Sequence, residues 1–160
     1  MVNKSSLLDL YRATHECVDL LLAHAAGMPA ALFVKNVNGV GIPSVRDQLV
    51  HTMSSESAWV SLLQYRPFTR LVPTAYPTAI SVVQAKDDVM ARTLEYFSGL
   101  DEVTFNTVLA ERPELWVGPL RSPAFILQHI ITHAFHHKGQ IVTLFRMLEH
   151  PIGDTDLQRA

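Results

Sequence analysis

Residues 127–148 read LQHIITHAFHHKGQIVTLFRML and contain four of the chain's eight histidines within nine positions. Apolar residues recur in this segment at steps of three and four, which is the period of an amphipathic helix. Ser122 can accept hydrogen bonds from free backbone N–H groups, and Pro123 lacks the N–H that would be unpaired at a helix start. The sequence therefore predicts a helix that begins at these two residues and ends at Glu149 or His150.

Three other segments have the same period and are bounded by helix start or stop signals. They predict helices over about residues 6–26, 44–65 and 79–98. The connection over residues 66–78 holds three prolines and no clear period, so we expect a long crossover rather than a tight turn. Such a crossover lets the third helix lie parallel to the second. The predicted fold is an all-α four-helix bundle, with residues 1–160 as a single domain.

The segment over residues 102–121 has the least regular pattern. Its VTFNTVL stretch has some strand character, whereas Pro113, Gly118 and Pro119 interrupt any long element. A short hairpin and an irregular lid are both compatible with this pattern.

Composition and charge exclude several classes of protein. The chain has 160 residues, 48% of them hydrophobic, and a formal net charge of −2 without a basic block, so a nucleic-acid interface is not expected. Cys17 is the single cysteine, which rules out an internal disulfide and fits a reducing compartment. The sequence shows no signal peptide and no uncharged apolar run long enough for a membrane span. We expect a cytoplasmic protein.

The histidines of the last predicted helix differ in the direction they face. At about 100° per residue from His129, His137 falls at about 80° and His133 at about 40°, whereas His136 falls at about 340°. His133 and His137 therefore face the interior or its edge, where two imidazoles four residues apart can hold one metal ion. Neutral imidazoles suit zinc, nickel or iron. The core arc, between about 60° and 160°, is predicted to contain Ile126, Leu127, Ile130, Ala134, Ile141, Leu144, Phe145 and Leu148.

A third ligand would distinguish a metal site from histidines that merely pack in a core. His51 is the best candidate because it lies mid-helix among apolar residues, and a bundle can bring the second and fourth helices together. His15 and His24 on the first helix are weaker competitors. His129, Glu56 and Gln140 are possible partners that orient the imidazoles, although packing or solvation is the favoured interpretation of each.

Several other metal and catalytic patterns are absent from the sequence. Residues 133–137 read HAFHH, which lacks the glutamate of the zincin motif His-Glu-x-x-His. The paired Glu-x-x-His motifs of di-iron bundles are missing as well. Cys17 has no recognisable catalytic motif around it, and Trp59 and Trp116 are expected to be packing residues.

Two segments resemble the DinB/YfiT-like family of metal-dependent four-helix bundles. The closing sequence HAFHHKGQIVTLFRML resembles the family's ending, in which a basic residue, glycine and glutamine follow the second histidine; here these are Lys138, Gly139 and Gln140. Lys138 stands where arginine is frequent in the family. The segment SVRDQLVHTMSSESAWVSLL resembles the family's second helix, with His51 as ligand and Trp59 downstream.

The resemblance implies a divalent metal ion held by His51, His133 and His137. Zinc or nickel is the first expectation, and iron or manganese the second. Some relatives are thiol S-transferases or isomerases that use mycothiol, bacillithiol or glutathione. This implies a low-molecular-weight thiol as cosubstrate and transfer of its sulfur to a small electrophile. One alternative is a metal-dependent hydrolase, in which the same ion activates water. The other is a non-catalytic, stress-related metal- or ligand-binding bundle, which the lack of a recognisable general base favours.

A second apolar strip on the last predicted helix lies away from the core arc. It consists of Phe125, Ile131, Phe135 and Val142. An exposed strip of this kind indicates a homodimer interface, and deeper burial inside the monomer is the alternative.

Overall fold

Four long helices form the bundle in the computed structural model, which describes residues 1–157. They are α1 (Lys4–Ala26), α3 (Val45–Leu63), α4 (Ala79–Ser98) and α6 (Pro123–Met147). The short elements are α2 (Ala30–Phe33), η1 (Pro73–Ala75) and α5 (Glu102–Asn106), and no strand occurs among residues 1–157. The predicted all-α class is confirmed.

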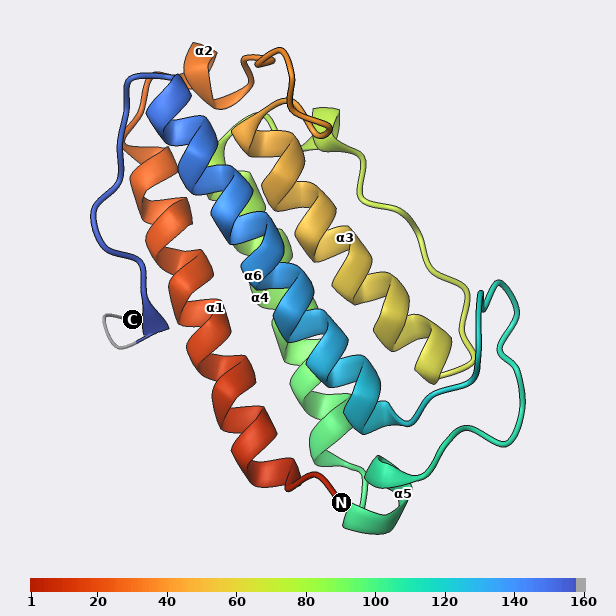
Figure 1. Ribbon diagram of the computed structural model, residues 1–160. Helices are drawn as coiled ribbons and strands as arrows, with labels where there is room; N and C mark the ends of the chain where they lie inside the picture. The colour runs from red at the N-terminus through yellow and green to blue at the C-terminus, as the bar shows by residue number, and fades with distance from the viewer. Residues whose placement is uncertain (158–160) are drawn as a thin grey trace.

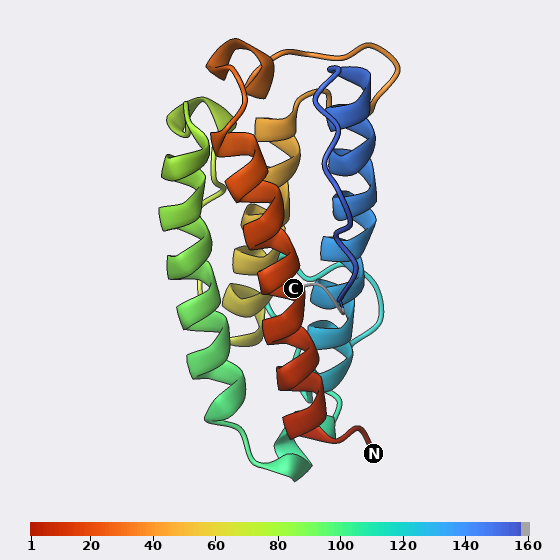
Figure 2. The same cartoon turned by 90° about the vertical axis from the view of Figure 1, so that its left-hand side faces the viewer.

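The crossover sets the direction of the helices. The chain leaves the lower end of α3, returns along the bundle to η1 and then enters α4, so α3 and α4 run in the same direction (Figure 1). Helices α1 and α6 run the opposite way. Seen from the side, α1 lies between α4 and α6 and covers part of α3 (Figure 2). Helix α3 packs on the antiparallel α6, and α4 packs on the antiparallel α1. Helices α3 and α4 also pack on each other.

Polar side chains cap the long helices where the sequence predicts helix starts. Ser44 Oγ accepts from the backbone N–H of Asp47 at 3.0 Å, and Ser122 Oγ accepts from that of Phe125 at 3.3 Å. Thr78 and Ser81 form a reciprocal capping box at the start of α4. Each cap satisfies a backbone donor that the helix leaves free and contributes about 1 kcal/mol.

Buried apolar side chains form two clusters, one towards each end of the bundle, and the buried residues include the whole predicted arc of α6. Ile131 is also buried, at 4% exposure, so its assignment to an outward strip is wrong. Because α6 packs against both α1 and α3, its buried face is wider than a single interface requires. Of the other strip residues, Phe125 is exposed, whereas Phe135 and Val142 are half-buried.

The segment over residues 102–121 contains no hairpin, so that alternative is wrong. Asp101 Oδ1 accepts from the backbone N–H of Thr104 at 2.8 Å and starts α5. Phe105 is fully buried beneath it. A cap and one buried aromatic side chain therefore outweigh the strand propensity of a short stretch. The rest of the segment is an irregular connection that buries Trp116.

None of the helices within residues 1–157 combines the length and the hydropathy that a membrane span needs.

Candidate metal centre

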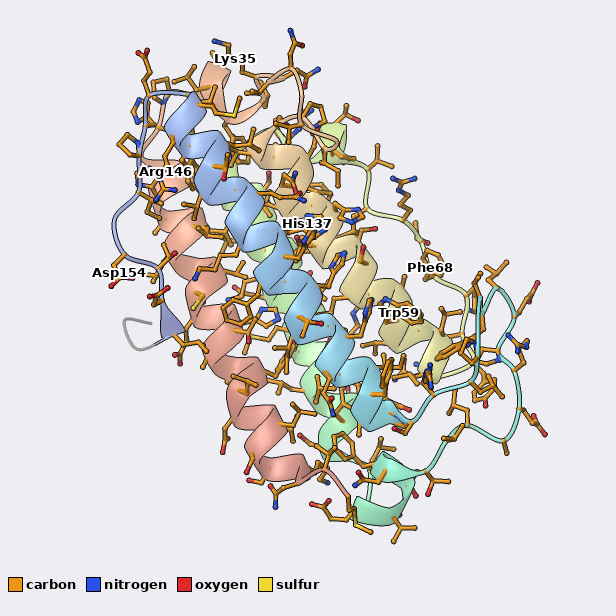
Figure 3. All side chains as sticks on the ribbon, in the orientation of Figure 1. Lys35, Trp59, Phe68, His137, Arg146 and Asp154 are labelled. Atoms are coloured by element: carbon orange, nitrogen blue, oxygen red, sulfur yellow. The ribbon has the colours of Figure 1, made fainter. Side chains whose placement is uncertain are left out.

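Three histidines meet where α3 faces α6. His51 comes from the middle of α3, and His133 and His137 come from successive turns of α6. Their ring centroids lie 5.2 Å (His51 to His133), 4.7 Å (His51 to His137) and 4.4 Å (His133 to His137) apart. One ring nitrogen from each lies within 4.8 Å of the other two, so the group could hold a metal ion. In Figure 3, His137 lies between the two helices.

Gln48 fixes the orientation of His137. The Gln48 amide nitrogen donates to the backbone carbonyl of Ile42 at 2.9 Å, so its oxygen must face the other way. That oxygen lies 2.6 Å from Nδ1 of His137, which must therefore carry the proton. Nε2 of the neutral ring is then left with a free lone pair, as a metal ligand requires. Gln48 itself is fully buried.

Burial keeps the imidazoles uncharged. Burial and, after it, the neighbouring rings, first that of His137, together lower the pKa of His133 to about 4. Burial followed by the proximity of His51 likewise lowers the pKa of His137 to about 4. The pKa of His51 is lowered by burial and then by the positive charge of Arg70. All three side chains can therefore donate lone pairs at neutral pH.

The spacing of the nitrogens fits a small divalent cation. Nε2 of His133 and Nε2 of His137 lie 3.1 Å apart. Two nitrogens bound to one tetrahedral ion at about 2.0–2.1 Å would be separated by about 3.3 Å. The donor set is three neutral nitrogens, which suits a borderline cation such as zinc or nickel better than a hard one such as magnesium.

Comparison with known families agrees with this architecture. The DinB family model matches residues 1–160. The chain belongs to the DinB family. Among curated proteins, none matches the chain. The family match covers the bundle from end to end, including both helices that carry the three histidines.

The other histidines of this DinB-family chain make different contacts. The His129 ring lies edge-on to Trp59, with 5.2 Å between centroids. His136 Nε2 lies 2.8 Å from the Gln140 amide nitrogen, and His24 Nε2 lies 2.9 Å from the backbone carbonyl of His150. None of these three histidines joins the close group of ligand atoms.

A second polar cluster lies inside the bundle around Glu56. Its Oε1 accepts hydrogen bonds from the hydroxyls of Tyr11 at 2.5 Å and Thr93 at 2.7 Å. Its Oε2 lies 3.1 Å from Nε2 of His15. Glu56 therefore joins α1, α3 and α4 rather than orienting a metal-site imidazole, in agreement with the packing interpretation of this residue. Cys17 is buried, as expected of a packing residue.

Gln48 is the site residue that the sequence analysis missed. A single buried glutamine inside a helix belongs to no spacing pattern. The available signal was its position three residues before His51, on nearly the same face of the same helix.

Cavity size alone does not locate the site. A cavity of about 460 Å³ lies between the end of α3 and the irregular connection, and none of the three histidines lines it. A cavity of about 210 Å³ does reach His51 and is open to solvent. It lies between α3 and the crossover, with Arg70 and Leu71 on the crossover side. Of the three histidines, His51 lines this smaller cavity, so a ligand that enters it lies beside the histidine group.

Proposed function

We propose that the chain binds one divalent metal ion through His51, His133 and His137. The observation that carries the proposal is that ring nitrogens of three uncharged imidazoles lie within 4.8 Å of one another. These imidazoles come from two helices that are far apart in the sequence. Zinc or nickel is the proposed ion, with iron and manganese as alternatives. His133 and His137 hold one side of the ion, and His51 holds the side next to the open cavity.

The test is elemental analysis of the purified protein beside its His51→Ala variant. We expect about one metal ion per chain in the wild type and a large loss in the variant. His136→Ala is a matched control, because His136 is adjacent to His137 in sequence but outside the close group, and it should keep its metal. Stoichiometric metal in His51→Ala would refute the ligand assignment.

We further propose that the site catalyses thiol S-transfer to a small electrophile. A bound divalent cation supplies a Lewis acid that lowers the pKa of a thiol or of water. Three neutral ligands support this chemistry because they leave the positive charge of the site undiminished. The thiol proton passes to solvent, the sulfur forms a bond to the electrophilic carbon, and the leaving group departs with the electrons of the broken bond.

Turnover of monochlorobimane by the metal-loaded protein tests the reaction. Mycothiol, bacillithiol and glutathione are each added in turn, and one of them should give thiol-dependent fluorescence that His51→Ala lacks. No turnover with any of the thiols would refute the transferase. Hydrolysis of an ester or amide without thiol would instead identify a metal-dependent hydrolase.

The remaining proposals concern the state of the protein in the cell. We propose that residues 1–160 act as one domain in a reducing cytoplasm, which the burial of the single cysteine, Cys17, supports. We also propose a homodimer, supported by Phe125, whose ring is 46% exposed on α6. Light scattering at micromolar concentration should give twice the mass of the chain; a monomer would refute the dimer.

A further inference from the structure

An exposed arginine lines the cavity beside His51. Arg70 lies on the crossover between α3 and η1, is exposed, and lines this cavity together with His51. Within residues 1–157, its guanidinium has no hydrogen bond, ion pair or ring contact. Its five N–H donors are therefore free to bind a ligand that enters the cavity.

The crossover is attached to α3 next to this arginine. The backbone N–H of Leu71 donates to Oγ of Ser54 at 3.1 Å. Ser54 is buried and lies one turn after His51 on α3. This hydrogen bond holds the backbone beside Arg70 against the helix that carries the histidine, so the fold places the Arg70 backbone next to the site.

The unpaired charge of the cavity is positive. Asp47 is the other charged residue in the lining of the cavity. Oδ1 of Asp47 forms an ion pair with Nε of Arg46 at 2.9 Å. Among residues 1–157, Arg70 has no such partner.

We propose that this cavity binds the carboxylate of a substrate whose other end reaches the metal ion, and that Arg70 is the residue that recognises it. The inference rests on the proposed metal function and adds the substrate class. The planar guanidinium fork matches the two oxygens of a carboxylate and can donate two parallel hydrogen bonds. The reactant that binds here is thus a carboxylic acid with its reactive group at a short distance from the carboxylate.

Binding of simple thiols to the cobalt-loaded protein tests this proposal. The probes are 2-mercaptoacetate, 3-mercaptopropionate and 4-mercaptobutyrate, each compared with its neutral amide. The sulfur-to-cobalt charge-transfer absorption band reports binding of the thiol, so the test does not depend on turnover. For the best-fitting chain length, the acid should bind the wild type about tenfold more tightly than its amide. Arg70→Gln should remove most of this preference and leave the affinity for the amide unchanged.

The matched control is Arg66→Gln. Arg66 lies on the same crossover, is also exposed, and lines the other, larger cavity instead. It should retain the preference of the wild type, which separates a local contact from the general attraction of anions to a cationic site. An equal preference for the acid in the wild type and Arg70→Gln would overturn the carboxylate site while leaving the thiol proposal intact.

Failure of every thiol to bind would refute the thiol part of the proposed function instead. Succinate and succinamate then decide the carboxylate site through the visible bands of cobalt, because one carboxylate of each can reach the metal. Tighter binding of succinate that depends on Arg70 would support the site. Equal affinities, or no binding of succinate, would overturn it.

Discussion

At the scale of single residues, Gln48 determines which nitrogen of His137 is free to bind a metal. Its amide is held on one side by the carbonyl of Ile42 and presents its oxygen to Nδ1 of His137. Replacing it by leucine removes the acceptor and leaves both ring nitrogens free to carry the proton. We expect Gln48→Leu to weaken metal affinity about 10- to 100-fold, measured by competition with a chromophoric chelator.

Two further variants make this prediction specific. Gln48→Glu keeps an acceptor oxygen for His137 but loses the donor to the carbonyl of Ile42, so it should bind metal more tightly than Gln48→Leu. Gln128→Leu removes a half-buried glutamine of α6 and should leave the affinity unchanged. A Gln48→Leu protein with a native circular dichroism spectrum and wild-type affinity would contradict the orienting role.

The same residues show how far the sequence identifies the site. Helical period places His133 and His137 inward, and the family resemblance adds His51, so all three could be named before the structure. The structure shows that the three histidines lie close together, whereas metal binding stays a prediction. Gln48 and Arg70 could not be named, because neither belongs to a repeated spacing and Arg70 lies on a segment without helical period.

At the scale of elements, Glu56 joins three helices through hydrogen bonds that favour its charged form. Burial raises the pKa of this carboxyl, but the contacts with His15, Tyr11 and Thr93 outweigh burial and hold it below the ordinary value of 4.5. A carboxylate whose pKa is lower in the folded state stabilises the fold above its unfolded pKa. That stabilisation is lost as the pH falls through the folded value.

Glu56→Gln should therefore lower the free energy of unfolding at pH 7 by roughly 3 kcal/mol, because it leaves buried partners incompletely paired. Below about pH 4.5, the difference in the free energy of unfolding between the variant and the wild type should become smaller. Urea titrations of the metal-free proteins between pH 7 and pH 3 measure both effects. Glu95→Gln, at an exposed position of α4, is the control. A difference in the free energy of unfolding between Glu56→Gln and the wild type that stays constant down to pH 3 would contradict the prediction.

His133 and His137 add a separate pH dependence to the metal-free protein. Their pKa values of about 4 lie below the ordinary 6.5, so the unfolded chain takes up protons first. Stability is then complete above about pH 6.5 and decreases as the pH falls towards 4. Both proteins in the Glu56 comparison share this decrease, and their difference therefore reports on Glu56.

The elements also differ in how well the sequence predicts them. The four long helices are predictable because period and caps agree over several turns. α5 is not, since in a five-residue helix the Asp101 cap and the burial of Phe105 matter more than propensity. From the sequence, Ile131 is placed on an outward strip because a helical wheel gives the direction of each side chain. The wheel does not give the number of neighbouring helices that cover that side chain.

At the scale of the whole molecule, the crossover between α3 and α4 has a consequence for the site. It places α6 antiparallel to α3 and next to it (Figure 1), so that histidines at positions 51 and 137 meet. This arrangement could be predicted from the length of the proline-containing connection. The width of the buried face of α6 could not, because it depends on α1 and α3 packing on it together.

A metal ion held at this junction would connect two helices that separate when the chain unfolds. Because the unfolded chain does not present the three imidazoles together, the ion binds the folded state and stabilises it. The gain is about 2.7 kcal/mol at free metal 100-fold above the Kd, or about 5–10 °C in Tm for a chain of this size. Calorimetry with and without zinc should show this rise in the wild type and in His136→Ala. His51→Ala should show little or none, and an undiminished rise in that variant would mean that zinc binds elsewhere.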